Sequence, residues 1–259
     1  MLWGVKMTAV LIGLSLVVIG CSTTTPPPDS SAVPPGPPDA RPEVIERHAT
    51  QFADELPERP PGSNEEQVAA SYILGFLQQA GYPGRLDGVP VADLVRSTNV
   101  IGTPPRGAKP EYLVAVPFGT PPNEALDAHS IGVFLEVARA LAVRESGHAI
   151  EFVALGAEFA EQEAGTLGSK TMASLLHEES LDPQIIYLSP ELSGDSFYAE
   201  GPLASEFEPA SSAGNAPLHG VALAAAAAYR NEGFEVTVID GDPEEVAVAL
   251  LEFLSQSTG

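Results

Sequence analysis

The chain has one cysteine, few basic residues and no apolar run long enough to cross a bilayer comfortably. Cys21 is the only cysteine among 259 residues, so no intramolecular disulfide can form. The folded part must therefore be stabilised by its own core. About 215 residues remain after the N-terminal segments, which is enough for one well-packed domain.

Lysine and arginine are scarce, with 12 basic residues against 35 acidic ones and a formal net charge of −23. Nucleic acids and anionic lipid surfaces attract cationic proteins, so this balance argues against both as partners. We interpret the acidity as a solubility feature, with a bound cation as the less favoured interpretation.

Two common catalytic signatures are also missing. No glycine-rich loop of the phosphate-binding kind follows an expected strand. Ser63, Ser169 and Ser193 have no histidine and aspartate placed nearby in the sequence, so a serine hydrolase has no support.

Residues 1–20 are typical of a secretory signal. Lys6 supplies a positive charge, and a short apolar run then ends at Gly20-Cys21. This ending resembles the lipobox of bacterial lipoproteins, in which the peptide is cut before the cysteine and the cysteine is lipidated. We therefore expect Cys21 to anchor the protein to a membrane of the bacterial cell envelope, facing the periplasm or the exterior. An uncleaved anchor helix and an ordinary secretory signal are the alternatives.

Residues 21–42 join the expected lipidated cysteine to a low-complexity segment rich in proline. Such a segment cannot bury a core and favours extended polyproline II. At roughly 3.1 Å per residue it would hold a domain up to about 60 Å from the membrane. We interpret it as a tether, with a ligand for a proline-recognising partner as the alternative. Residues 43–259 then form the domain.

Helices and strands are predicted to alternate along this domain. Ser63 and Glu66 fit a capping box, and apolar residues at helical spacing follow until Gly81. The later elements are a strand at 111–116, a helix at 130–143, a strand at 149–155, a helix at 168–177, a strand at 184–188, a helix at 221–230, a strand at 234–239 and a helix at 243–254. This alternation predicts an α/β fold, a three-layer αβα sandwich with a mostly parallel central sheet.

A degenerate motif, Gly156-Ala157-Glu158-Phe159, follows the second of these strands and precedes Gly168-Ser169. It resembles the Gly-Ala-Glu-Glu … Gly-Ser segment of the two-zinc aminopeptidases, family twenty-eight of the metallopeptidases. The resemblance implies that Glu158 stands at the position of the general base and Phe159 at the position of a zinc ligand. A phenyl ring has no lone pair to give a metal.

Scaffold positions extend this resemblance over roughly Arg59 to Gly194, with a looser continuation to Leu254. They are Arg59-Pro60-Pro61-Gly62-Ser63, Asn99-Val100-Ile101-Gly102 and the helix from Gly132 to Leu141. The resemblance therefore implies a zinc-peptidase-like fold.

The resemblance also implies a set of metal ligands that this chain mostly lacks. Pro117 stands where the family has its first histidine, and Gly119 where it has the orienting aspartate. Asp127 is the expected bridging aspartate, one residue away from the usual spacing, and Glu191 stands near the position of another aspartate. The late loop that carries the distal histidine is missing.

The carboxylates of Asp127, Glu158 and Glu191 remain. We therefore expect a protein that lacks a metal cofactor and binds a peptide or a protein, with Glu158 as a relic of the general base. The alternative is an active metal-dependent peptidase or related amide hydrolase that holds zinc at a rearranged site, with His129 or His219 as a replacement ligand. A structural envelope lipoprotein without a binding cleft is a third interpretation.

Overall fold

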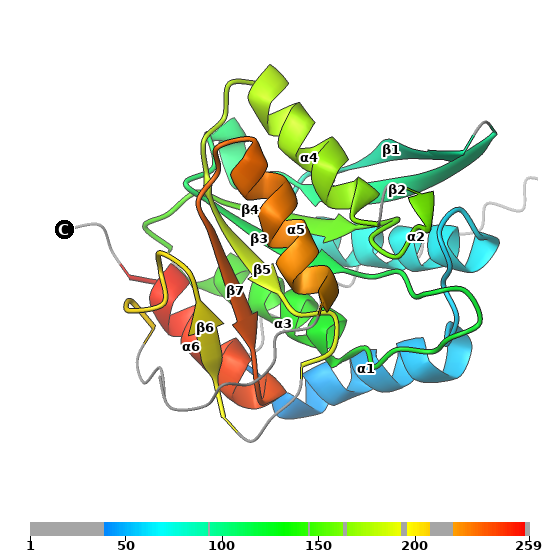
Figure 1. Cartoon of the computed structure of the whole chain (residues 1–259). Coiled ribbons are helices and arrows are strands. Elements are labelled where there is room, and N and C mark those ends of the chain that lie inside the picture. Colours follow the sequence, from blue (N-terminus) through cyan, green and yellow to red (C-terminus); the bar gives the residue numbers. More distant parts are fainter. Residues whose placement is uncertain are drawn as a thin grey trace, which may run out of the picture. The chain divides into compact units, whose positions relative to one another are not determined.

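The computed structural model describes residues 39–92, 94–144, 146–162, 165–192, 196–207 and 220–256 (Figure 1). The expected signal peptide, the lipidation of Cys21, the proline-rich segment up to residue 38 and His219 lie outside these residues. Within them, no helix is long and apolar enough to cross a membrane.

A seven-stranded sheet forms the centre of the domain, in the order β1-β2-β4-β3-β5-β7-β6. The strands are β1 (Gly84–Ala92), β2 (Val95–Gly102), β3 (Tyr112–Pro117), β4 (Ile150–Leu155), β5 (Gln184–Leu188), β6 (Tyr198–Glu200) and β7 (Val236–Asp240). The central strands β4, β3, β5 and β7 pair in parallel. At the edges, β1 pairs antiparallel with β2, β2 with β4, and β6 with β7. The predicted, mostly parallel sheet is therefore confirmed.

Helices cover both faces of this sheet (Figure 1). The helices are α1 (Pro42–Glu55), α2 (Asn64–Gln79), α3 (His129–Val143), α4 (Leu167–Glu178), α5 (Gly220–Asn231) and α6 (Pro243–Leu254), with a short 3₁₀ turn η1 (Pro105–Gly107). One hydrophobic cluster joins α1, α2, α3 and α6 to the sheet, and a second joins α4 and α5 to its other face. The expected three-layer αβα arrangement is confirmed.

The sequence of β3 shows why two cores form. Val114 and Val116 belong to the cluster under α3 and α6, whereas Leu113 and Ala115 belong to the cluster under α4 and α5. Successive side chains of a strand point to opposite faces, so a strand that is apolar throughout feeds both layers.

Helix α1 has no counterpart among the elements expected from the sequence. It begins with Pro42 at its first turn and buries Val44, Ile45 and Phe52 on one face. The described fold also includes Asp39–Arg41, which the expected boundary assigned to the linker and which hydrogen-bond to α3.

Candidate functional site

The residues predicted from the family resemblance lie at the carboxyl ends of the parallel strands. Pro117 is the last residue of β3, and Glu158 and Glu191 follow the ends of β4 and β5. These strands are parallel neighbours, so their carboxyl ends meet at the same edge, where ligand sites of α/β sheets are usually found.

The side chain of Glu158 is directed into the protein interior and is 1% exposed. Its Oε1 accepts a hydrogen bond from the backbone N–H of Ser169 at 2.7 Å, and its Oε2 accepts from the Ser169 hydroxyl at 2.9 Å. The Tyr187 hydroxyl donates to Oε2 at 3.1 Å. Burial raises the pKa of Glu158 to about 7, although these hydrogen bonds act in the opposite direction.

These contacts give Glu158 a structural role at the start of α4. Ser169 lies in the first turn of α4, where backbone N–H groups lack helical partners and a carboxylate is favourable. A general base must come within hydrogen-bond reach of the water that it activates. With both oxygens held by Ser169 and Tyr187, this carboxylate is committed to the interior.

A second buried carboxylate, Glu66 at the start of α2, lies beside the same turn. It accepts hydrogen bonds from the Gly62 N–H at 2.6 Å, the Ser97 hydroxyl at 2.7 Å and the Ala157 N–H at 3.1 Å. Burial raises its pKa, against the effect of these hydrogen bonds. The sequence signal for it was the capping box. The Ser63 hydroxyl accepts a hydrogen bond from the Glu66 N–H, as expected. The Glu66 carboxylate itself accepts from the N–H groups of Gly62 and of Ala157 in the motif.

The turn after β3 is closed by Arg59. The side-chain Nε of Arg59 donates to the Phe118 carbonyl at 2.7 Å, and the backbone N–H of Arg59 donates to the Thr120 hydroxyl at 2.8 Å. A Cβ added to Gly119 would lie 3.3 Å from the Arg59 carbonyl oxygen. Burial lowers the pKa of Arg59 to about 10. Pro117 offers no metal donor here, and Gly119 leaves little room for a side chain, so this turn does not fit a zinc ligand pair.

Asp127 contacts His129 at the start of α3. Its Oδ1 accepts from the His129 N–H at 2.7 Å and lies 2.7 Å from the ring Nδ1, while Nε2 lies 2.9 Å from the Glu46 carboxylate of α1. Burial lowers the pKa of His129, but the hydrogen bonds and charges of Glu46 and Asp127 outweigh it and raise the pKa overall. The Asp127 N–H also reaches a Glu191 oxygen at 3.5 Å.

The residual candidate ligands therefore divide between two places. Asp127, His129 and Glu191 lie together near the surface, whereas Glu158 binds Ser169 and Tyr187 in the interior. Both ring nitrogens of His129 face carboxylates. Across the part of the chain that the structure describes, no three histidine, cysteine or acidic residues are placed to hold a metal ion.

Phe159 lines an apolar surface hollow at the position of the family's zinc ligand. The hollow measures about 310 Å³ and adjoins the end of β1. Its lining residues are mostly apolar: Pro60, Pro61, Val91, Ala92, Val95, Pro122, Phe159 and Ala160, with Glu161 and Gln162 beside them. Phe159 therefore contributes to an apolar surface and offers no metal donor.

No protein-family model and no curated protein matches this sequence. Solved structures do match. A leucine aminopeptidase precursor from Bacteroides thetaiotaomicron has a TM-score of 0.64 at 16% identity, covering 85% of this chain and 98% of that one. A glutaminyl cyclase from Fimbriiglobus ruber has a TM-score of 0.66 at 13% identity, covering 83% and 95%. The LapA aminopeptidase of Legionella pneumophila has a TM-score of 0.61 at 10% identity, covering 83% and 72%. The chain therefore has the fold that these aminopeptidases and glutaminyl cyclases share.

Proposed function

We propose that this protein is a membrane-anchored, non-catalytic binding protein built on an aminopeptidase-like fold. The observation that carries the proposal is the burial of the Glu158 carboxylate between Ser169 and Tyr187. Pro117 and Phe159, which the family resemblance aligns with zinc ligands, offer no metal donor.

The chemistry explains why these changes matter together. Zinc is bound by cysteine, histidine or carboxylate side chains, and a metal-bound water is the usual nucleophile of such hydrolases. Without a metal the pKa of water stays far above neutrality. A buried carboxylate with no contact to that water cannot replace the metal.

The proposed location follows from the N-terminal sequence. The signal-like composition of residues 1–20 and the lipobox-like ending at Cys21 support attachment to a membrane of the cell envelope. Multiple acyl chains on one cysteine anchor firmly, since each buried CH₂ contributes about 0.8 kcal/mol. The net charge of −23 makes nucleic acid an unsuitable partner.

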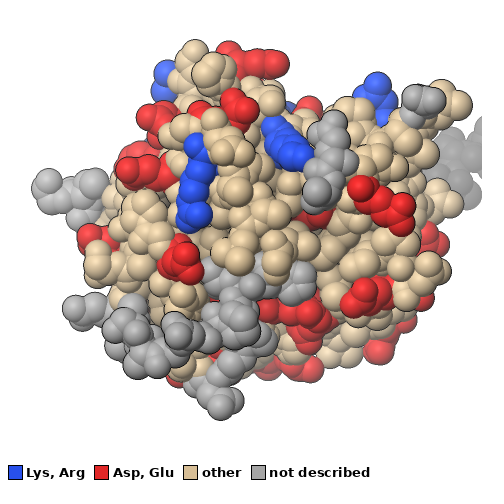
Figure 2. Space-filling model, in the orientation of Figure 1, with Lys and Arg blue, Asp and Glu red and all other residues tan. Residues whose placement is uncertain are grey.

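The ligand that we propose is an extended peptide segment with an apolar side chain next to basic residues. The hollow at Phe159 offers an apolar seat, and Glu161 lies at its margin. Val91 and Ala92 in this hollow belong to β1, an edge strand of the described sheet, and an edge strand can pair with an added peptide. Figure 2 shows acidic side chains spread over the drawn face with few basic ones, which favours a cationic ligand.

The absence of metal chemistry is tested with the full chain purified in detergent. After incubation with zinc and dialysis, elemental analysis should find no stoichiometric zinc. Aminoacyl and N-terminal glutaminyl substrates should remain unchanged. One or more tightly held zinc ions together with chelator-sensitive turnover would overturn the proposal.

Ligand binding is tested by calorimetry with peptides that share one apolar core and carry either lysine or glutamate at the flanks. We expect the lysine peptides to bind more tightly and Phe159→Glu to weaken them. Val68→Glu is the matched control, because Val68 is exposed on α2 and does not line the hollow. Equal binding by both peptide types, or no effect of Phe159→Glu, would contradict this site.

A metal-dependent hydrolase with a rearranged site is the second candidate function. The observation in its favour is the contact of Asp127 with both His129 and Glu191 at the edge of the sheet. The same zinc measurement decides between the two, and His129→Ala should abolish zinc binding only if this second candidate is correct.

A further inference from the structure

The outer edge of β1 carries main-chain hydrogen-bonding groups at alternate residues. In the described sheet β1 is an outermost strand, and β2 is its neighbour (Figure 1). Just before β1 begins, the Thr103 N–H donates to the Pro83 carbonyl at 2.9 Å, so Pro83 faces β2. The backbone groups of successive residues in an antiparallel strand face opposite sides. The residues of β1 that face β2 are therefore Arg85, Asp87 and Val89, and those that face the open edge are Gly84, Leu86, Gly88 and Pro90.

Pro90 agrees with this alternation and limits the open edge. Proline has no N–H, and an edge strand tolerates it where its nitrogen faces away from the neighbouring strand. The pairing of β1 with β2 also becomes irregular directly after Pro90. An added strand can therefore form complete hydrogen-bonded pairs with Gly84, Leu86 and Gly88.

The side chains along this stretch form a short pattern of an apolar residue between opposite charges. Leu86 is 49% exposed, which is high for a large apolar side chain. Arg85 and Asp87 flank it and point to the other face of the strand, because successive side chains of a strand alternate.

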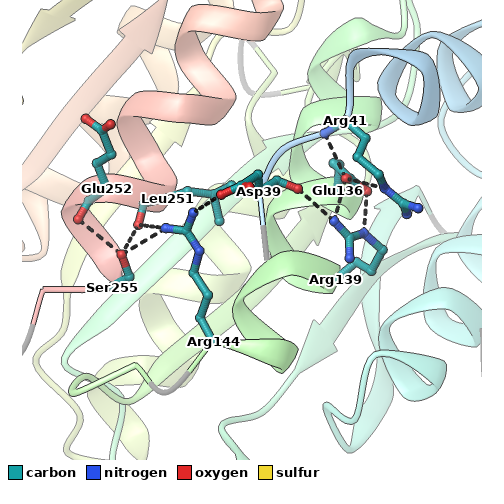
Figure 3. Close-up of polar contacts among 8 residues, drawn as sticks. All are labelled: Asp39, Arg41, Glu136, Arg139, Arg144, Leu251, Glu252 and Ser255. Carbon is teal, nitrogen blue, oxygen red and sulfur yellow. Dashed lines mark hydrogen bonds and ion pairs between the residues drawn. The ribbon is translucent and has the colours of Figure 1, made fainter. Parts of the chain in front are cut away.

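Arg85 is available to a partner in a way that other arginines are not. Arg41 and Arg139 bind the buried Glu136 inside the domain (Figure 3). The Arg85 side chain is 48% exposed, and its ion pair with Glu179 lies at the surface. A further carboxylate can therefore approach Arg85 from outside.

We propose that this edge pairs with the same edge of a second copy of the chain, antiparallel and about a two-fold axis at Leu86. Leu86 then lies opposite Leu86 of the second copy, so that two exposed apolar side chains cover each other. Arg85 lies opposite Asp87 of the second copy, and the symmetry repeats this ion pair. Gly84 lies opposite Gly88, so no side chain obstructs either end of the ladder.

Neighbouring two-fold registers fit the chemistry of this edge less well. An axis at Asp87 places two aspartates opposite each other, and an axis at Arg85 places two arginines opposite each other. Like charges directly opposite in a sheet are destabilising. An axis at Gly88 places Leu86 opposite Pro90, which cannot donate a hydrogen bond. The sequence of β1 therefore selects the register centred on Leu86.

The pairing is small and leaves the hollow at Phe159 open. Residues 84–88 cover less than the roughly 800 Å² per partner of a standard interface, so we expect a dimer that dissociates on dilution. The net charge of −23 on each copy opposes association at low ionic strength. The ladder ends before Val91 and Ala92 in the hollow, so the dimer does not depend on the proposed peptide binding.

Disulfide trapping of the full chain in detergent tests this pairing, in about 150 mM salt to screen repulsion between the copies. Directly opposite, hydrogen-bonded residues have Cα atoms about 5.5 Å apart, a distance that a disulfide spans. We expect mild oxidation to shift Leu86→Cys to the mass of a covalent dimer. Leu94→Cys is the matched control, because Leu94 is 97% exposed in the turn after β1, far from the axis. The parent chain, with Cys21 alone, gives the background.

A charge exchange in the Leu86→Cys chain tests the register. Arg85→Asp should reduce the trapped dimer several-fold, because it places two carboxylates opposite each other. Adding Asp87→Arg should restore the dimer, because opposite charges then face each other again. Neither variant keeps the ion pair between Arg85 and Glu179, so the comparison isolates the contact between the two copies.

A Leu86→Cys chain that stays monomeric, or a Leu94→Cys chain that dimerises as strongly, would overturn the pairing. Failure of Asp87→Arg to restore the dimer would overturn the register centred on Leu86. A peptide is the other possible occupant of this edge. If Leu86→Cys stays monomeric and the lysine peptide slows hydrogen exchange of the Leu86 and Gly88 N–H groups in the parent chain, the edge binds a peptide and the dimer is wrong.

Discussion

The turn at Gly156-Ala157-Glu158-Phe159 is held by two buried carboxylates. Glu66 receives the Ala157 N–H, and Glu158 receives the Ser169 N–H on the other side of the turn. Ala157 has a φ of 55°, in the left-handed region that non-glycine residues seldom adopt. Buried backbone donors need partners, so these carboxylates stabilise the conformation of the turn.

Glu158→Gln should reduce the pH dependence of stability. Burial raises the pKa of Glu158 from its ordinary value of 4.5 to about 7. Its contribution to stability is therefore complete below about pH 4.5 and is lost as pH rises through about 7. Between pH 5 and pH 8 the free energy of unfolding should fall by about 2–3 kcal/mol less in the variant than in the parent, as measured by urea denaturation.

Glu161→Gln is the matched control for this measurement, because Glu161 is exposed and should leave the profile unchanged. Glu151 and Glu66 also have raised pKa values through burial, so a residual fall in stability towards pH 8 is expected in every variant. A pH profile of Glu158→Gln that coincides with the parent would show that this carboxylate ionises normally.

At the residue scale, the sequence could not predict which distant side chains contact the buried carboxylates. The motif identified Glu158 and Ser169, because their spacing is local. It could not show that Tyr187, on β5 and 29 residues away, supplies the third hydrogen bond. Glu66 was predicted as a helix cap, but its contacts with Ser97 and Ala157 depend on how β2 and β4 pair.

At the scale of elements, α4 depends on close backbone contact with the motif. A Cβ on Gly168 would lie 2.1 Å from the Gly156 carbonyl oxygen and 2.9 Å from a Glu158 oxygen. Gly168→Ala should therefore displace the start of α4 and lower the free energy of unfolding by about 1–3 kcal/mol. Urea denaturation measures this loss.

Gly75→Ala in α2 is the control, since nothing lies within 4 Å of a Cβ there. Alanine is the better helix former, so this variant should raise the free energy of unfolding by about 0.5–1 kcal/mol. If Gly168→Ala proved as harmless as Gly75→Ala, the close contact of α4 with the motif would be wrong.

The elements that sequence predicted well are those with strong local patterns. Helix α6 begins with Asp242 as its cap, which accepts from the N–H groups of Glu244 and Glu245, as expected from Asp242-Pro243. Strand β1 was missed because Gly88 and Pro90 interrupt it and both of its faces are partly exposed. Such strands are defined by pairing with a neighbour, here β2, rather than by alternation.

At the scale of the whole molecule, stability depends on the balance between hydrophobic burial in the two cores and repulsion among the acidic side chains. The two hydrophobic clusters on either face of the sheet supply the favourable burial. Against them stands a net charge of −23, with red acidic side chains spread over the face drawn in Figure 2. Like charges at high density destabilise a compact state.

Salt should therefore stabilise this protein. The Debye length falls from about 30 Å at about 10 mM salt to about 8 Å at 150 mM, which screens repulsion between exposed carboxylates. The buried Arg41–Glu136–Arg139 group should be screened much less, and exposed pairs such as Arg85–Glu179 contribute little. We expect the free energy of unfolding, measured in urea, to rise over this range of sodium chloride.

Potassium chloride at the same ionic strength should act like sodium chloride, because screening depends on ionic strength and not on the cation. A fall in stability with either salt would mean that surface ion pairs outweigh repulsion. A larger gain with one cation would instead indicate a specific cation site, the less favoured interpretation of the acidic composition. The result therefore separates solubility from ion binding as the reason for so many carboxylates.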